Sequence, residues 1–465
     1  MRTPLHRRLT LLVSALPLST LVAQAPFQLA VQPAAHQPAP ALQSFSLGTN
    51  NGNWLLVGGR RNGFHRTSDR ESTFPTRYAN DSLFVVDPGS GRRWSMMLPA
   101  PLKLQLRVTN AASTQDGDVL FVVGGYGSTC DADDRTCYQT FPTLTAINVP
   151  AAMSAIRAGQ PDRLLAATAT LTDERLRVAG GALRKLGRDY VLLFGQNYDS
   201  VYKGAYTGKY TGEVRRFGLR LGGAVAGGTG PSTVAIVRYA AVGDPAGASP
   251  ASEYHRRDLN VAETVWPNGR VGLAVYGGVF TPQGGSWVHP LYVDDGTTAP
   301  RVRLDTTFSQ RMSAYDCARA AFYDPTARTM YTSLLGGISL YYYDASGALV
   351  PSSVDNFMPF ISAITTIVRR PDGRTVETPQ PATASLPKLI GANAEFIPLA
   401  RLGRMLGTRD VIDMRRLPSG PRVLVGQMYG GIIATAPQSS EFNPTFADST
   451  IYDVYLVRTA PGVRH

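Results

Sequence analysis

The chain contains few of the residues from which enzymes build metal sites and nucleophiles. Its 465 residues include three cysteines and six histidines, and no HExxH, CxxC, paired-histidine or GxSxG pattern occurs. The glycine-rich stretch 222–232 has no lysine to hold a phosphate, so it is a connecting loop and not a P-loop. We therefore expect no metal and no cofactor.

Long apolar runs are also missing after residue 25. No later stretch reaches the roughly 18 uninterrupted apolar residues that a membrane-spanning helix requires, so we expect no transmembrane segment. Residues 1–25 combine three early arginines, a mostly apolar stretch broken by Pro17, and a small-residue site at Ala23-Gln24-Ala25. This pattern is typical of a secretory signal peptide. We predict that residues 26–465 are exported as one domain, to the periplasm, the cell surface or the extracellular space.

Positive charge is abundant but is not concentrated anywhere. The formal net charge is +12, and the basic residues fall in pairs along the chain, at 60–61, 92–93, 215–216, 256–257, 369–370 and 415–416. Nucleic-acid-binding domains gather such charge on one stripe and carry a recognisable module. We therefore expect no nucleic-acid partner.

The three cysteines allow one local disulfide. Cys130 and Cys137 flank a six-residue polar loop, and an exported protein permits disulfides. We predict that these two residues pair, which leaves Cys317 as a buried apolar thiol.

Glycine and proline, by contrast, are plentiful, with 46 and 33 residues, which favours many turns over long helices. The stretch LFVVGG (120–125) ends an apolar run in two glycines, although glycine normally weakens a strand. Similar runs end in Gly-Gly at Gly59, Gly278, Gly337 and Gly431. The gaps between the second glycines are 66, 153, 59 and 94 residues. Because 153 is about twice the shorter gaps, we expect a degenerate copy near residue 200, and LLFGQ (192–196) fits if Gln196 replaces the second glycine.

The surroundings of the motif repeat as well, in units numbered 1 to 6. A tight-turn signal such as Asn51-Gly52 precedes most copies, and further strands follow, for example at 82–87, 144–149, 213–219, 289–293 and 452–458. Each unit is therefore predicted to contain four antiparallel strands. Six such units predict an all-β fold, a six-bladed β-propeller with long loops on one face.

Unit 1, with GGRRNGFHR followed by NDSLFVVDPGSGRRW, resembles a Kelch repeat. The chain also resembles secreted bacterial Kelch-repeat proteins of unestablished function, in the stretches TFPTLTAI (140–147), RRDLN (256–260), YGGVF (276–280), MYTSLLGGISLYYYD (330–344) and GANAEFIP (391–398). The resemblance implies a Kelch-type propeller. It brings no catalytic residues to this sequence.

Closure of the ring requires the two ends of the chain to share one unit. The last strand (451–458) is expected to pair with a segment soon after the signal peptide, either 27–32 or 45–47. The choice between these two segments stays open.

The loops that follow each Gly-Gly are the expected functional region, because the tight turns on the opposite face leave no room for a pocket and function usually sits on loops held by a rigid frame. These loops carry arginine, aromatic and polar residues that suit an anionic or hydroxyl-rich ligand. The candidate ligand-binding residues are Arg60, His65, Arg66, Tyr126, Gln196, Tyr202 and Trp287. Alternatively, these side chains only pack the loops against each other.

Two classes of function remain. The first is a binding scaffold, with a protein partner, a carbohydrate or a small anionic ligand held at the loop face. The second is a carbohydrate-directed enzyme resembling a sugar-acid epimerase, in which the arginines hold a carboxylate while a glutamate or histidine moves a proton. No catalytic residue is assigned, because a fold does not choose between functions.

Overall fold

The structure is a computed structural model of the full chain, and it describes residues 25–64, 74–131, 135–202, 208–352, 358–439 and 443–459. The predicted signal peptide, apart from its last residue, and the candidate residues His65 and Arg66 lie outside the described residues. No helix among the described residues is long and apolar enough to cross a membrane.

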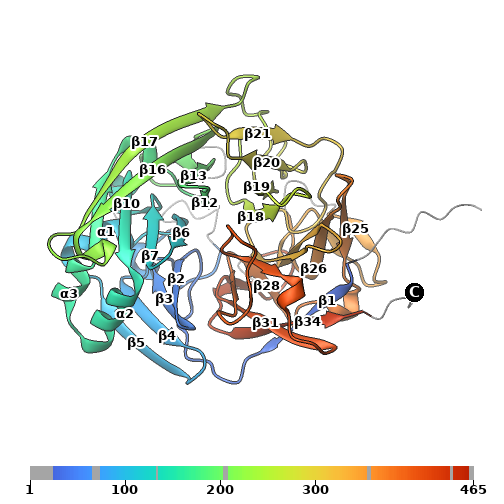
Figure 1. The fold of residues 1–465 in the computed structure, drawn as a ribbon, viewed down its shortest axis with the longest axis horizontal. Helices are drawn as coiled ribbons and strands as arrows, with labels where there is room; N and C mark the ends of the chain where they lie inside the picture. Colours follow the sequence, from blue (N-terminus) through green and yellow to red (C-terminus); the bar gives the residue numbers. More distant parts are fainter. Residues whose placement is uncertain are drawn as a thin grey trace, which may run out of the picture.

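Six large sheets surround a central channel (Figure 1). Within the described residues, five of them have four antiparallel strands and one has five strands. We number the sheets by unit and write the strands from the channel outward. Sheet 1 is β2 (Ser46–Asn50), β3 (Asn53–Val57), β4 (Ser82–Asp87) and β5 (Arg92–Met97); sheet 2 is β6 (Ala112–Asp116), β7 (Val119–Val123), β10 (Thr143–Asn148) and β11 (Thr168–Thr172); sheet 3 is β12 (Ala182–Leu186), β13 (Asp189–Leu193), β16 (Glu213–Gly222) and β17 (Thr233–Gly243).

The second half of the chain continues the same order. Sheet 4 is β18 (Asn260–Val265), β19 (Val271–Tyr276), β20 (Leu291–Asp294) and β21 (Arg301–Leu304); sheet 5 is β22 (Ala318–Asp324), β23 (Thr329–Ile338), β26 (Phe360–Arg369) and β27 (Thr375–Pro379); sheet 6 is β29 (Glu395–Pro398), β31 (Arg422–Tyr429), β34 (Ile451–Arg458) and β1 (Phe27–Pro33). A further short strand, β30 (Val411–Asp413), pairs in parallel with β22. The predicted strand 82–87 is β4 with the same bounds, and 452–458 lies within β34.

Short sheets, helices and 3-10 turns lie outside the six large sheets. The short sheets are β8 (Tyr126–Ser128) with β9 (Tyr138–Thr140), β14 (Gln196–Asn197) with β15 (Lys209–Tyr210), β24 (Tyr341–Tyr343) with β25 (Leu349–Pro351), and β28 (Leu389–Ala392) with β32 (Ile432–Ala434) and β33 (Thr445–Ala447). The helices are α1 (Ala100–Leu106), α2 (Val149–Ala158) and α3 (Pro161–Ala166), with 3-10 turns at Thr76–Tyr78, Arg135–Cys137, Glu174–Leu176, Gly223–Ala226, Ala382–Ala384 and Met414–Arg416.

The paired glycines allow each sheet to touch the next one. Gly124 and Gly125 have φ of +66° and +91°, a region that L-residues rarely adopt. A Cβ on Gly124 would lie 2.0 Å from the carbonyl oxygen of Val178 in the following unit, and the N–H of Gly125 donates to that same oxygen at 2.7 Å. The second glycine of four other units donates to the next unit in the same way, including Gly431, which donates to Leu42.

In unit 3 the glycine pair also contacts the next unit, but the glycine that is replaced is not the one expected from the sequence. Phe194 has φ +53° and Gly195 has φ +85°, and the N–H of Gly195 donates to the carbonyl of Arg256 in the next unit at 2.8 Å. Phe194 therefore replaces the first glycine, whereas the sequence suggested that Gln196 replaced the second. The expectation was wrong by one residue, and Gln196 occupies the position just after the pair.

A chain of backbone hydrogen bonds runs around the channel where the innermost strands begin. From unit 2 to unit 6, the N–H of one residue donates to the carbonyl oxygen of the equivalent residue in the preceding unit, in five bonds of 2.7 to 3.3 Å. The six linked residues are Ser44, Asn110, Gly180, Asp258, Asp316 and Asn393. Five of them have positive φ, with Asp316 as the exception. Glycine, asparagine and aspartate tolerate this conformation best, which explains the residue types at four of the five positions, Ser44 being the exception.

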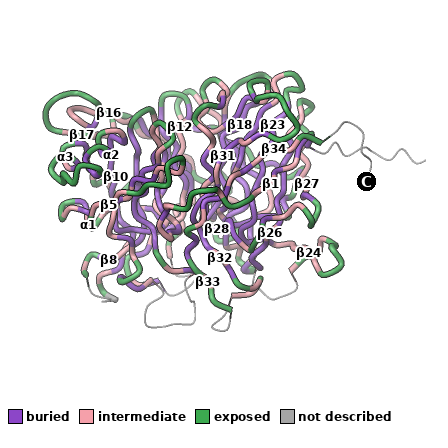
Figure 2. The backbone as a smooth tube through the Cα atoms, turned by 90° about the horizontal axis from the view of Figure 1, so that it is seen from below, coloured by how far each residue is buried: buried purple, intermediate pink, exposed green. Residues whose placement is uncertain are grey.

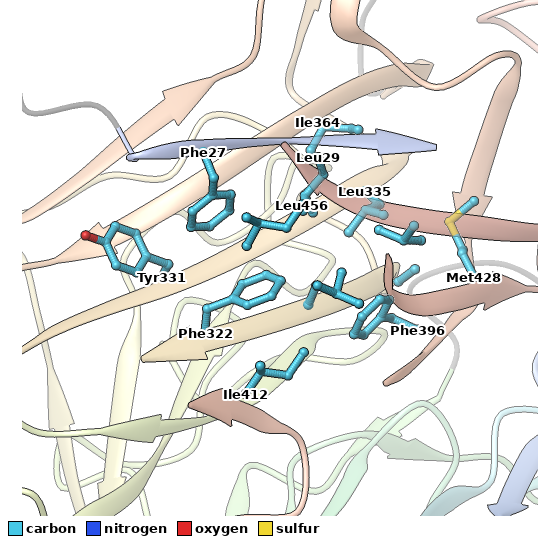
Figure 3. Close-up of a cluster of buried hydrophobic side chains, with 14 of the residues drawn as sticks. Phe27, Leu29, Phe322, Tyr331, Leu335, Ile364, Phe396, Ile412, Met428 and Leu456 are labelled. Atoms are coloured by element: carbon cyan, nitrogen blue, oxygen red, sulfur yellow. The ribbon is translucent and has the colours of Figure 1, made fainter. Parts of the chain in front are cut away.

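The two ends of the chain meet in sheet 6. β34 lies between β31 and β1, and Phe27 pairs with Arg458 at one end of the β1–β34 ladder. Of the two closing segments expected, the structure therefore has the first. Side chains of β1 and β34 pack against sheet 5, with the rings of Phe27 and Phe322 5.1 Å apart (Figure 3).

Unit 6 departs from the predicted tight turn. In the other units a short turn joins the two innermost strands, but β29 and β31 are joined by residues 399–421. Part of this link is β30, which crosses to sheet 5. The Ser419-Gly420 signal lies at the end of this long connection, so it does not form the expected hairpin turn.

Candidate functional site

The channel opens on two faces of the molecule. The post-Gly-Gly face carries the short sheets β8–β9, β24–β25 and β28–β32–β33, which lie together at the lower side of Figure 2. The tight-turn face lies opposite, where the innermost strands end. We call the two openings the post-Gly-Gly mouth and the tight-turn mouth, and the ring of six linked residues lies between them.

Arg257 is the centre of the post-Gly-Gly mouth. Its side chain is buried, donates to the hydroxyl of Tyr202 at 3.1 Å, and lies 3.5 Å from the carboxylate of Asp258. With its amide oxygen turned toward Arg257, Gln196 accepts from the guanidinium at 2.5 Å. Burial and Arg257 act in opposite directions on Asp258, and burial prevails, so the pKa of this carboxyl is raised.

Tyrosines fill the space around Arg257. The hydroxyl of Tyr126 donates to the carbonyl of Ser200 at 3.2 Å and accepts from the backbone N–H of Tyr202 at 2.8 Å. The ring of Tyr198 lies 5.2 Å from that of Tyr202 and 5.7 Å from that of Tyr126. Burial raises the pKa of both Tyr126 and Tyr198. The cavity that the described residues leave here has a volume of only about 40 Å³, which is too small for most small molecules.

The structure brings three of the candidate residues together. Tyr126, Gln196 and Tyr202 line the same small cavity. Arg60 lies at a neighbouring hollow, where its side chain donates to the carbonyl of Pro75 at 3.0 Å and stacks over Phe74. Trp287 lies apart from them, because its indole N–H donates to the carbonyl of His255 at 2.7 Å.

The predicted cysteine pair lies on the post-Gly-Gly side. Cys130 and Cys137 form a disulfide that joins the β8 and β9 ends of their loop, and Cys317 is a free thiol with no exposed surface. Burial raises the pKa of the Cys317 thiol to about 12, so this thiol is unreactive at neutral pH.

The tight-turn mouth holds a much larger cavity, of about 220 Å³. This finding corrects the expectation that the tight turns leave no room for a pocket. The cavity forms because strand ends from several sheets, including Asn51 and Gly52 at the end of β2, surround the channel without filling it, and the long connection of unit 6 roofs it. Its charged lining residues are Arg184, Glu263, Arg319, Glu395, Arg404, Arg409 and Asp410.

A neck of polar residues forms the floor of this cavity. Ser113, Arg184, Arg319 and Glu395 line both the large cavity and the next one inward, which has a volume of about 60 Å³. Arg319 is tied to Asp316 by a salt bridge, and Arg184 donates to the carbonyl of Val261 at 2.9 Å. Glu395 accepts no hydrogen bond from any of the described residues. Burial raises the pKa of Glu395, against the opposing effect of Arg319.

Glu263 lies in the same cavity on β18. One of its carboxylate oxygens accepts from the backbone N–H groups of Arg409 and Asp410, at 2.8 and 2.7 Å, and the residue is only 6% exposed. Burial and the neighbouring carboxylate of Asp410 raise the pKa of Glu263 to about 7, against the lowering effect of these hydrogen bonds and of Arg184. A carboxyl with this pKa exchanges a proton readily at neutral pH.

Sequence reasoning missed the channel residues, although a signal was present. Ser44, Asn110 and Gly180 each precede the second glycine of their unit by the same interval, 15 residues (59 − 44, 125 − 110, 195 − 180). The innermost strands follow directly, and Arg184, Glu263, Arg319 and Glu395 are the charged residues on these strands that line the large cavity. RRDLN (256–260) leads into the innermost strand β18, and GANAEFIP (391–398) contains the innermost strand β29.

Comparisons with known proteins add little information about the site. No protein-family model and no curated protein matches the sequence. Among solved structures, the structure of YjhT aligns with a TM-score of 0.45 and 9% sequence identity, covering 89% of this chain and 99% of that one. At that level the likeness says nothing about what this chain binds.

Proposed function

We propose that the chain is an exported six-bladed propeller of the Kelch type that acts as a binding scaffold and holds a small polar ligand in its channel. The six large sheets, the glycine contacts between them and the ring of linked residues support the propeller. The signal pattern in residues 1–25 supports export to the periplasm, the cell surface or the extracellular space.

One observation carries the choice of site: the cavity at the tight-turn mouth is several times larger than the cavities beside Arg257 and Arg60, and it is lined by charged side chains. At about 220 Å³ it suits a molecule of monosaccharide size. At the post-Gly-Gly mouth the polar groups already pair with one another, so we move the ligand from the expected face to the opposite one. A protein partner on the post-Gly-Gly face stays a prediction.

The groups in the cavity favour a ligand with both a negative charge and hydroxyls. Arg184 and Arg319 provide positive charge at the neck, which attracts a carboxylate. Glu395 and the second oxygen of Glu263 have free lone pairs, which accept hydrogen bonds from hydroxyl groups. A small carbohydrate carrying a carboxylate satisfies both demands.

Thermal-shift measurements test this function. We expect glucuronate or gluconate to raise the melting temperature by about 2–5 °C at saturating concentration, in a panel that also contains neutral monosaccharides and amino acids. Glu395→Ala, which removes the acceptor oxygens, should abolish most of this shift, whereas Arg60→Ala, a change at the other mouth, should leave it intact. If no molecule of the panel shifts the melting temperature, or if only Arg60→Ala abolishes the shift, the channel site is wrong.

A carbohydrate-directed enzyme on the same scaffold is the second candidate, and Glu263 is the observation that favours it. Its carboxyl lies in the cavity with a pKa of about 7, as a general acid or base requires. In D₂O, an enzyme of this kind would exchange a carbon-bound proton of a sugar acid for deuterium, which NMR detects. No exchange with wild-type protein would leave only the binding role.

A further inference from the structure

The long connection of unit 6 forms a hairpin over the tight-turn mouth. Arg404 bridges to Ile412, and the N–H of Met405 donates to the carbonyl of Val411 at 2.9 Å. We call residues 404–412 the mouth hairpin. Arg404, Arg409 and Asp410 of this hairpin line the large cavity directly, so it lies between the cavity and the solvent.

The base of the mouth hairpin is firmly attached. Val411 and Ile412 are fully buried, and their strand pairs with β22. Met405 packs on the cluster that contains Val265 and Tyr323. The side chain of Arg404 donates to three carbonyl oxygens of the same connection, at 2.8 to 3.0 Å. The base therefore moves little while sheet 5 stays folded.

The tip of the hairpin is attached much less. Leu406 is 96% exposed, so the tip lacks an apolar anchor. Its polar attachments are the two backbone N–H groups that donate to Glu263 and a long hydrogen bond, 3.4 Å, from Arg409 to the carbonyl of Gln115. Two short hydrogen bonds to a single carboxylate oxygen thus hold the tip across the channel from sheet 6 to sheet 4.

We propose that the mouth hairpin is a lid on the channel and that Glu263 is its latch, whose charge sets how firmly the lid closes. The role of the lid in admitting a ligand rests on the function proposed above. The latch itself is a property of the free protein.

The charges around Glu263 determine the direction of the pH effect. Asp410 and Arg404 face it from the hairpin, and Arg184 faces it from β12. Lifting the tip removes Asp410 and admits water, so the pKa of Glu263 returns from about 7 toward its ordinary value of 4.5. The closed lid therefore binds a proton more tightly than the open one. Acid favours closure, and the lid loosens as the pH rises through 7.

Hydrogen exchange of the amides of Arg409 and Asp410, the two that donate to Glu263, tests the latch without any ligand. After correction for the intrinsic rate, exchange in the wild type should become about tenfold faster between pH 6 and pH 8, because the closed-state pKa lies within that interval. Glu263→Gln keeps one acceptor oxygen but cannot titrate, so its exchange should be flat over the same range. Glu263→Ala removes the acceptor and should speed exchange at least tenfold at pH 6.

Glu377 offers a matched control. It also accepts from two consecutive backbone N–H groups, those of Arg311 and Met312, and burial raises its pKa to about 7, but it lies on β27 away from the large cavity. Glu377→Gln should leave exchange at Arg409 and Asp410 unchanged.

Two outcomes overturn the latch: an unchanged exchange rate in Glu263→Ala, or a wild-type pH profile in Glu263→Gln. If Glu263→Ala does not fold, the Glu263→Gln profile decides alone. Neither outcome bears on ligand binding, which the thermal-shift panel decides separately. If no compound shifts the melting temperature but hydrogen exchange of the hairpin depends on pH as expected, the channel ligand was wrongly assigned and the latch was not.

Discussion

At the post-Gly-Gly mouth, Arg257 lies among tyrosines and pairs with Gln196, Tyr202 and Asp258. At the tight-turn mouth, Glu395 has no hydrogen-bond partner among the described residues, and Glu263 uses one of its two oxygens. The cavities measure about 40 and 220 Å³. Both mouths contain buried charge, but among the described residues only the tight-turn mouth has polar groups left over for a ligand.

This difference distinguishes a cluster of charges that stabilises the fold from a site that can bind a ligand. Buried charges that satisfy each other hold loops together, and they gain nothing from a small molecule that would have to displace a partner. Buried charges with unused hydrogen-bonding capacity raise the energy of the empty site, and a polar ligand can relieve that cost. The arginine and aromatic composition that suggested a site in the sequence is common to both situations.

The largest expected effect is at the satisfied mouth. Arg257→Met should lower the free energy of unfolding by about 3–5 kcal/mol, because it leaves Asp258 buried without its cation. Arg61→Met, a change at an exposed arginine of the same face, should alter it by less than about 0.5 kcal/mol. Urea denaturation measures both variants. A small effect of Arg257→Met would mean that this mouth is not held together by charge pairing.

The next effect belongs to the open mouth and depends on pH. Burial raises the pKa of Glu263 from 4.5 to about 7, so its contribution to stability is complete below pH 4.5 and is lost as the pH rises through 7. Relative to Glu263→Gln, the wild type should lose up to about 3 kcal/mol between pH 4.5 and pH 8. Thermal or urea unfolding across that range measures the difference. Parallel curves for the two proteins would show that Glu263 does not titrate as expected.

The smallest effect distinguishes a structural hydroxyl from a ligand-binding one. Tyr202→Phe removes the acceptor of the 3.1 Å bond from Arg257 and should cost about 1 kcal/mol of unfolding free energy. The thermal shift caused by a sugar acid should stay the same in this variant. Loss of that shift with unchanged stability would return the ligand to the post-Gly-Gly mouth.

Much of the frame was predictable from local patterns. The alternation of strands and turns and the recurring glycine pair follow from turn chemistry and apolar runs, which are properties of short segments. The sequence also offered 27–32 as one of two closing segments, and the structure chose it. The copy in unit 3 was found but misaligned, because Phe194 adopts a positive φ that phenylalanine seldom takes. Local rules fail where the neighbouring unit imposes the conformation.

The candidate site was predictable only in part. Tyr126, Gln196 and Tyr202 do converge, and the sequence had assigned all three to the loops that follow the glycine pairs. Whether they bind a ligand or one another depends on distances between loops of different units, which spacing along the chain does not give. The sequence also predicted a tight turn at Ser419-Gly420, between the two innermost strands of unit 6. These strands are instead joined by the long connection that lines the large cavity.

The sequence by itself determined the repeating strands, because glycine pairs, turn dipeptides and apolar alternation act within a few residues. Only the tertiary structure decided which mouth stays open. That outcome depends on side chains from different sheets, such as Arg184, Glu263 and Glu395, facing one space. It also depends on one long connection that crosses from sheet 6 to sheet 4. The burial and the charge of this cavity are set jointly by residues that lie far apart in the sequence. No single stretch of the chain determines them.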